Sequence, residues 1–379
     1  MSLTALSAGR WRRIRGLVRK EIIQIWRDPS SLLVAFAHPM LLLFLFGFGL
    51  SFDANVVRIG LVVEQPSPDT AWFEIALTNS PYFDVRIAQD RRAFVDALTA
   101  GWIDGIVVVP GDFAARAARG DMAPIQVITD GSDPNTANFV TGYAKGAWQI
   151  WQLQQRARAG AKMVAPVVTE PRFWFNPELK SRRALLPGSI AQILMMVGSL
   201  LTALIVAREW ERGTMEALLA TPIGRLEFIA GKLIPNFMLG MGAMAVSVAA
   251  AVWVFDVPFR GSILSLVGIT AVFLLVALGL GLLVSTAVRT QFAASQIATL
   301  VSFLPSLFFS GAIFEIAAMP AILRGFAAVV PARYYVDSLQ TIFLAGDVWP
   351  LLLRSGAILA VIALVVIAFT VRKTRMRLD

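Results

Sequence analysis

PGSIAQILMMVGSLLTALIVA, residues 187–207, runs for about 20 residues without a charged side chain, as a helix that crosses a bilayer does. Five further runs are similarly apolar, at about 31–51, 233–255, 262–286, 293–313 and 350–371, the last with a single charged residue, Arg354, near its start. The chain of 379 residues is 57% hydrophobic and only 16% charged, with a mean hydropathy of +0.68. A soluble fold of this size does not bury so much apolar surface. The sequence therefore predicts a polytopic α-helical membrane protein with six transmembrane helices.

The basic residues that flank these runs predict the orientation of the chain. The net charge is +9, and most of the flanking Lys and Arg residues fall on one predicted side. They are Arg10, Arg12, Arg13, Arg15, Arg19, Lys20, Arg27, Arg208, Arg212, Arg225, Lys232, Arg289, Arg372, Lys373, Arg375 and Arg377. The other side carries mainly Arg260, Arg324 and Arg333. The positive-inside rule then places both termini, including the basic tail 372–379, in the cytoplasm of a multi-pass protein of the bacterial inner membrane. Membrane topology therefore accounts for the positive net charge of the chain, and no nucleic-acid partner is expected.

Residues 1–30 predict an amphipathic helix that lies in the cytoplasmic interface. Apolar side chains recur at helical spacing, basic ones fall largely between them, and Asp28-Pro29 ends the helix. A solvated helix with an accidental apolar stripe is the alternative. The helix is expected to contact membrane lipid, and its candidate residues are Trp11, Ile14, Val18, Lys20, Glu21, Ile22, Trp26 and Arg27.

The region between the first two spans, residues 52–184, has the alternating pattern of a small α/β domain. Strands are predicted at 56–64, 82–88, 104–110 and 125–131, and helices at 69–78, 90–101, 112–120 and 134–160. Because it is bracketed by two spans, this domain is expected to lie outside the cytoplasm. It contains no His or Cys, so a nucleophile and base pair is not expected there.

Several kinds of site are excluded or disfavoured by the residues that are missing. The chain has no Cys and a single His, His38, which excludes thiolate and His-cluster metal sites. The segment Gly224–Lys232 departs from the nucleotide-binding P-loop in spacing and context. No metal, no cofactor on this chain and no enzymatic activity of its own are therefore expected. Charged residues are also scarce within the spans, which argues against an ion-coupled carrier.

The segment REWERGTMEALLATP, 208–222, interrupts the apolar pattern with charges, a glycine and a short amphipathic piece. Together with residues up to 232, it forms a cytoplasmic loop that predicts a docking surface for another protein. A self-paired interfacial loop is the alternative. The candidate docking residues are Glu209, Glu211, Arg212, Gly213, Thr214, Glu216, Leu218, Leu219, Thr221 and Pro222.

The run E-x-E-x-G-T-x-E-x-L-L-x-T-P-x-x-x-x-E-x-x-x-G-K, 209–232, resembles that of ABC-2 type transporter permeases, the membrane subunits of ATP-binding-cassette exporters. KEIIQIWRDPSSL, 20–32, resembles the interfacial helix of the family, and 308–320 and 329–346 resemble its re-entrant external segment, placed here at 311–345. The resemblance implies a dimer, made with a second copy or a sister permease. It also implies a cytoplasmic ATPase subunit that holds ATP and Mg and contacts the 208–222 loop and the interfacial helix.

The resemblance implies export of a hydrophobic or amphipathic substrate, drug-like or lipid-like, out of the cytoplasm or the inner leaflet. In the fifth span, a helix broken at Pro305 and followed by Phe308, Phe309 and Gly311 is predicted as an external gate; a plain helix end is the alternative. A mechanotransmitter, which relays ATPase motion to an extracytoplasmic partner without moving cargo, is the alternative function. Engagement of a periplasmic adaptor is left open, and a membrane enzyme is disfavoured.

Overall fold

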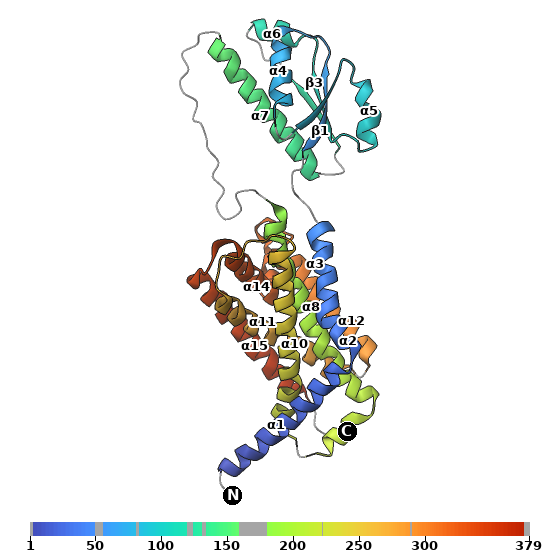
Figure 1. The fold of residues 1–379 in the computed structure, drawn as a ribbon, viewed down its shortest axis with the longest axis vertical. Coiled ribbons are helices and arrows are strands. Elements are labelled where there is room, and N and C mark those ends of the chain that lie inside the picture. The colour runs from blue at the N-terminus through green and yellow to red at the C-terminus, as the bar shows by residue number, and fades with distance from the viewer. Residues whose placement is uncertain are drawn as a thin grey trace. The chain divides into compact units, whose positions relative to one another are not determined.

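The chain divides into two compact units in a computed structural model that describes residues 3–49, 56–80, 83–119, 124–130, 134–158, 180–221, 223–288 and 290–374. One unit, here called the helical unit, comprises residues 1–51 and 173–379. The other, the α/β unit, comprises residues 52–172. Both are drawn in Figure 1.

Within its described residues, the helical unit contains six helices that are long and apolar enough to cross a membrane, as the sequence predicts. The first, Pro29–Gly49, consists of α2 (Pro29–Leu32), a π-helical turn (Leu33–Ala37) and α3 (His38–Gly49). The others are α8 (Ser181–Glu211), α10 (Arg225–Trp253), α11 (Ile263–Ala287), α12 (Gln291–Phe309) and α15 (Trp349–Lys373).

Helix α8 is the centre of the helical unit, packing against α3, α10, α11, α12 and α14 (Figure 1). Small residues allow its closest neighbour to approach, since a Cβ at Gly281 of α11 would lie 1.9 Å from the backbone oxygen of Ser199. Nearby, the Thr202 hydroxyl donates to the carbonyl oxygen of Leu278 at 2.7 Å. Small residues with interhelical hydrogen bonds are how helices associate in a bilayer, where burial of apolar surface supplies little drive.

The other helices described in this unit are α1 (Leu3–Trp26), α9 (Thr214–Leu219), α13 (Ala321–Ala327) and α14 (Pro331–Gln340), with a 3₁₀ turn at Ile316–Ala318 and a π-helical turn at Thr341–Ala345. The predicted re-entrant segment therefore holds two helices. Its α14 is well packed, because the ring of Tyr335 is fully buried and stacks on Phe273 with centroids 4.0 Å apart.

The expectation of a helix broken at Pro305 is wrong. Helix α12 continues through Pro305 to Phe309, and the chain leaves it at Gly311, whose φ of 84° lies in the left-handed region. A helix can tolerate proline in a membrane when neighbouring groups satisfy the freed backbone. The helix therefore ends four residues after Pro305, and the turn follows at Gly311, because glycine adopts this conformation without a steric penalty.

The α/β unit is a four-stranded sheet with helices on both faces. Along the chain it contains β1 (Val57–Val63), α4 (Pro68–Thr78), β2 (Phe83–Ala88), α5 (Arg92–Thr99), β3 (Gly105–Val109), α6 (Phe113–Arg119), β4 (Gln126–Thr129) and α7 (Pro134–Arg158). The strand order is β2-β1-β3-β4; β1 is parallel to β2 and β3, and β4 is antiparallel to β3. Every strand and helix predicted for this region is present.

Helices α4 and α7 cover one face of the sheet and α5 covers the other (Figure 1). The larger core, on the α4 and α7 face, is built from β-branched and aromatic side chains such as Val107, Phe73 and Trp151. The smaller core lies around Phe94 of α5. The near-continuous burial of β1 and β3 is typical of parallel strands covered on both sides.

Candidate functional site

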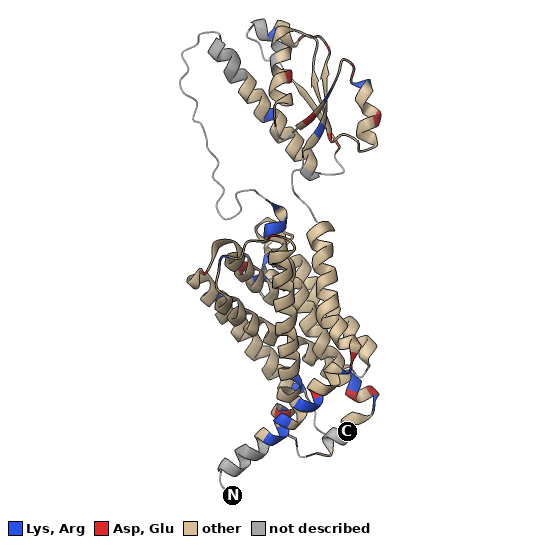
Figure 2. Cartoon of the chain, viewed as in Figure 1, with Lys and Arg blue, Asp and Glu red and all other residues tan. Residues whose placement is uncertain are grey.

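Charged residues gather at one end of the helical unit. Figure 2 shows them along α1, at the end of α8 and on α9, whereas the middle parts of α8, α10 and α11 carry almost none. This end contains the connection from α8 through α9 to α10, which is the loop predicted to dock another protein. The candidate site is therefore built from α1, α9 and the adjoining turns of α8 and α10.

The turn from α8 into α9 is formed by Arg212 and Gly213. Gly213 adopts a φ of 67°, which ends α8 in the manner of a left-handed glycine cap. Helix α9 follows at once, and its Met215 is only 2% exposed. Met215 packs in an apolar cluster with Phe228 and Ile229 of α10, so α9 is anchored to the ends of two long helices.

A buried network of ions joins α1, α8 and α10. The ammonium group of Lys232, 1% exposed, donates to Oε1 of Glu21 at 2.6 Å and to Oε1 of Glu209 at 2.7 Å. Lys20 donates to the same oxygen of Glu209 at 2.9 Å. The other carboxylate oxygen of Glu209 accepts a hydrogen bond from the hydroxyl of Thr214. We call these five residues the buried ion network.

Three of the four charges in the buried ion network are almost fully buried, whereas the side chain of Lys20 is 45% exposed. Glu21 and Glu209 are 3% and 4% exposed, and both face the cation of Lys232. An isolated charge at such a depth is strongly unfavourable, and it persists only when it is paired and hydrogen-bonded. The network therefore fixes how α1 and the start of α9 sit against α8 and α10.

Two further ion pairs lie on either side of this network. Arg13 of α1 donates two hydrogen bonds to the carboxylate of Glu227, at 2.7 and 2.8 Å. This contact raises the pKa of Arg13. Arg208 of α8 donates to Asp28 at 2.5 Å, before α2. Burial acts to raise the pKa of Asp28, but hydrogen bonds from Ser30, Arg208 and other neighbours outweigh it and hold that pKa below its usual range.

The comparison with known families bears directly on this arrangement. A family model described as "ABC-2 family transporter protein" matches residues 29–372. The match takes in the six long helices, the α8–α10 connection and the α/β unit. The chain belongs to the ABC-2 transporter family.

Three relatives of this ABC-2 protein match it over most of their length. The probable multidrug ABC transporter permease YbhS of Escherichia coli (strain K12) is 47% identical over 370 residues, which is 97% of this chain and 98% of the relative. The probable multidrug ABC transporter permease YbhR of the same organism is 25% identical over 352 residues, 90% and 94% of the two chains. The linearmycin resistance permease protein LnrN of Bacillus subtilis (strain 168) is 22% identical over 362 residues, 88% and 92%.

Membership of the ABC-2 family identifies the chain as a membrane permease subunit rather than a catalytic chain. It implies a separate ATPase partner and assembly as a dimer. Together with the six long apolar helices, it indicates a multi-pass membrane protein.

The ABC-2 permease uses some of its predicted docking residues internally. Glu209 lies in the buried ion network, and Glu211 accepts hydrogen bonds from the backbone and side-chain amides of Gln291 at the start of α12. Arg212, Glu216 and Thr221 are exposed. Pro222 and the side chains of Leu218 and Leu219 lie outside the residues that the structure describes. Thr214 and Gly213 shape the turn.

The predicted apolar stripe of α1 is only partly the side that meets the rest of the ABC-2 permease. Ile14, Val18 and Ile22 are half-buried, while Trp11 and Trp26 are 68% and 76% exposed and Arg27 is exposed as well. The packed side of α1 lies elsewhere on the helix and consists of Arg13, Leu17, Lys20 and Glu21. A Cβ at Gly231 would come within 2.7 Å of the Cβ of Leu17, so α1 crosses α10 at this glycine.

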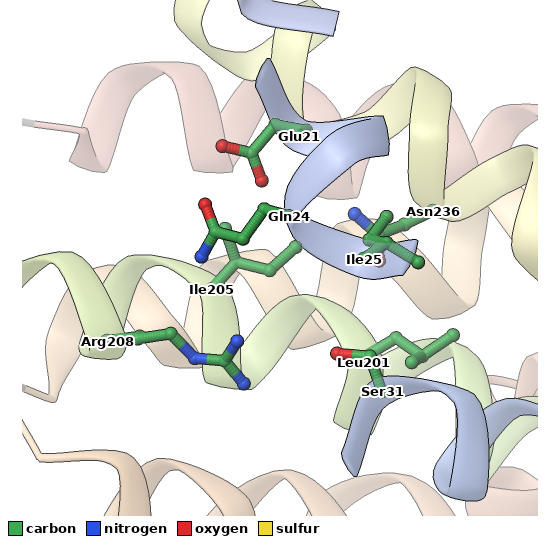
Figure 3. A pocket seen from close by; sticks show the side chains of 8 residues that line it. All are labelled: Glu21, Gln24, Ile25, Ser31, Leu201, Ile205, Arg208 and Asn236. Carbon is green, nitrogen blue, oxygen red and sulfur yellow. The ribbon is translucent and has the colours of Figure 1, made fainter. Parts of the chain in front are cut away.

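A small pocket lies beside the buried ion network, between α1, α2, α8 and α10. Its lining residues are Glu21, Gln24, Ile25, Ser31, Leu201, Ile205, Arg208 and Asn236. Figure 3 shows Glu21 and Gln24 on α1 and Arg208 on α8 lining the same opening. The pocket marks a place where polar groups, rather than tight apolar packing, separate α1 from the long helices.

The predicted gate residues lie at the far end of α12 from Gln291. Phe308 is 45% exposed and stacks on Phe314 with ring centroids 5.6 Å apart, across the turn at Gly311. Pro305 and Phe309 are half-buried. The structure thus brings Phe308 and Gly311 to one turn, and Pro305 lies a helical turn before it.

Several residues of the site were not singled out in the sequence as charge partners, notably Arg13, Asp28, Glu227 and Lys232. One signal was present in the sequence. Glu21 is the single acidic residue among residues 1–27, in a segment otherwise rich in Arg. A single carboxylate in this basic segment predicts a cationic partner. The sequence does not identify that partner as Lys232, which is more than 200 residues away.

Proposed function

We propose that this chain is the membrane-spanning subunit of an ATP-driven exporter, with ATP and Mg held by a separate cytoplasmic ATPase subunit. The observation that carries the proposal is the anchoring of α9 to α8 and α10 through Met215 and the buried ion network. A displacement of α9 by the ATPase would be transmitted directly to α8 and α10. A permease subunit that does not hydrolyse ATP itself requires such a connection.

The docking surface would be the exposed side of the α8–α9 connection. Arg212 and Glu216 are exposed there, whereas Glu209 is buried and holds the segment in place. Exposed charges set partner choice, and buried ones set geometry. Helix α1, tied to the same network, would contact the membrane interface and the ATPase. Glu209 and Glu211 then act as positioning residues in coupling.

The membrane placement rests on charge. Arg13, Arg208 and Arg225 belong to the basic end of the helical unit, and the positive-inside rule favours the cytoplasm for that end. Both termini would be cytoplasmic and the α/β unit extracytoplasmic, in the inner membrane of a bacterium. The turn around Gly311 would then face outward, where the stacked Phe308 and Phe314 are placed to form an external gate.

The proposed cargo is hydrophobic or amphipathic, drug-like or lipid-like, and leaves the cytoplasm or the inner leaflet. The names of the relatives, which include multidrug permeases and a linearmycin resistance permease, support this class. The scarcity of charge in the middle of the long helices also supports it.

A second permease, identical or a sister chain, would cover part of α12. Gln296 is exposed on this helix, and Ser295 and Thr299 are half-exposed beside it. Polar side chains directed at lipid tails are unfavourable, so they normally face protein or a water-filled path. This face supports a dimer contact along α12.

The α/β unit supports a second candidate function. It has its own apolar core, separate from that of the long helices. A mechanotransmitter would use such a unit to act on an extracytoplasmic partner, such as a periplasmic adaptor, without moving cargo. Purified complex in vesicles distinguishes the two functions: ATP-dependent movement of a lipophilic dye supports export, and ATP hydrolysis without dye movement supports the mechanotransmitter.

The proposal is tested first by isolating the chain from its native membrane in mild detergent and identifying what accompanies it. We expect an ATPase subunit at one copy per permease. The charge reversal Glu216→Lys should lower ATPase recovery and coupled ATP hydrolysis about tenfold or more, since like charges placed together across an interface are strongly unfavourable.

The matched control is Glu315→Lys, which reverses another exposed acid, beyond the far end of α12. It should leave ATPase recovery unchanged. Normal recovery with Glu216→Lys, or no ATPase with the unaltered chain under conditions that preserve other such complexes, would contradict the proposal.

A further inference from the structure

Helix α1 has three sides rather than two. At about 100° per residue, its contact side carries Arg13, Leu17, Lys20 and Glu21, which meet α8 and α10. A second side carries the apolar residues Trp11, Ile14, Val18, Ile22 and Ile25. The third side carries Arg12, Arg15 and Arg19, followed along the helix by Trp26.

The third side, here called the free arginine side, has no charged partner within the part of the chain that the structure describes. Arg12, Arg15 and Arg19 are all exposed and form no ion pair among the residues that the structure describes. By contrast, Arg13 and Lys20 of the same helix are committed to Glu227 and Glu209. The basic residues of α1 are thus divided between an internal and an external role.

The direction of the free arginine side follows from the other two. The apolar side lies about 115° from the contact side and about 100° from the free arginine side, in opposite senses around the helix. If the apolar side faces the bilayer, as in the proposed function on which this step rests, the other two flank it. One flank meets the long helices, and the other points along the membrane plane away from them.

We propose that the free arginine side binds the headgroups of anionic phospholipids that surround the permease. Guanidinium groups form paired hydrogen bonds with phosphate, and three of them on one side give a local positive field. Trp26, 76% exposed on the same side, is suited to the headgroup level. An ATPase would approach from the cytoplasmic direction, which lies near Gly16 rather than along this flank.

The test uses the full-length chain in detergent, mixed with equal amounts of phosphatidylglycerol and phosphatidylcholine of matched acyl chains. Native mass spectrometry counts the bound lipids of each kind. We expect the unaltered chain to retain phosphatidylglycerol preferentially, with a preference that weakens as salt is raised. The triple variant Arg12→Gln, Arg15→Gln, Arg19→Gln should reduce that preference about fivefold or more.

Two variants make the result specific. The control Arg225→Gln, Arg372→Gln, Lys373→Gln removes the same charge from exposed positions off α1 and should keep the preference. Replacing Arg12, Arg15 and Arg19 by Lys should keep most of it, which also shows that the helix tolerates change at these positions.

An unchanged preference in the Gln triple, or an equal loss in the control, would overturn the proposal. So would a Gln triple that keeps its lipid preference but loses the ATPase, because the arginines would then bind protein. Failure of the proposed function has a different outcome: no ATPase accompanies the unaltered chain, while its preference for phosphatidylglycerol persists.

Discussion

The α1–α8–α10 junction and the α/β unit place their charges in opposite ways. At the junction, Lys232 and two carboxylates are buried and paired with one another. In the α/β unit the ion pairs Arg58–Asp104 and Arg116–Asp112 lie at the surface. The core beneath them is apolar, with side chains such as Leu61 and Phe73 fully buried.

The contrast teaches what each region must achieve. An apolar core stabilises a fold strongly but tolerates shifts of packing, because dispersion and burial are not directional. A closed network of charges adds little net stability, yet departures from its geometry leave an uncompensated charge. The junction must transmit a displacement in the proposed function, and a network with one favourable arrangement suits that task.

The largest effect is expected from Lys232→Met. This variant leaves Glu21 and Glu209 buried without their cation and should destabilise the helical unit by about 3–5 kcal/mol. Titration of the purified chain with a denaturing detergent, followed by tryptophan fluorescence, measures the loss. Adding Glu21→Gln and Glu209→Gln should recover much of it. A mild effect comparable to that of Lys373→Met, at an exposed position, would show that the network is not closed.

A smaller or comparable loss, of about 2–5 kcal/mol, is expected from Leu61→Ala in β1. The side chain is fully buried in the core of the α/β unit, so truncation removes apolar contacts and leaves a cavity. Limited proteolysis should cut this unit earlier while ATPase recovery is retained. The control Ile87→Ala, at a position 48% exposed in β2, should change little. Parallel loss of the helical unit would show that the two regions are not independent.

The smallest effect is expected from Arg116→Gln. Its pair with Asp112 spans one helical turn, and both side chains are about half exposed. Such pairs contribute about 0.3–0.5 kcal/mol. The same proteolysis assay should give a rate close to that of the unaltered chain. A rate of cutting as high as that of Leu61→Ala would show that this surface ion pair stabilises the unit as much as a buried apolar side chain does.

Much of the architecture was predictable because it depends on local patterns. The six long helices follow from apolar length, the strands of the α/β unit from short β-branched runs, and the end of α1 from Asp28-Pro29. The break in α12 was misplaced at Pro305, since the role of proline depends on whether neighbours satisfy the backbone. Gly311, with its left-handed backbone, was the better indicator of the helix end.

Only part of the candidate site could be predicted from the local sequence pattern. The loop 208–222 stood out by its charge, but which of its residues face outward did not. Glu209 and Glu216 have the same chemistry and lie two turns apart, yet one is buried and the other exposed. The difference depends on Lys232 and Lys20, which approach from other helices.

By itself, then, the sequence determined the class of the protein, the number and position of its long helices, the α/β insertion and the place of the charged loop. These follow from the length and period of apolar runs, which act over a few residues at a time. Only the tertiary structure decided that α1 packs through Leu17 against Gly231, and that its charges divide between internal partners and a free side. Pairing of distant charges depends on which helices are neighbours, and the pattern along a single helix does not contain that information.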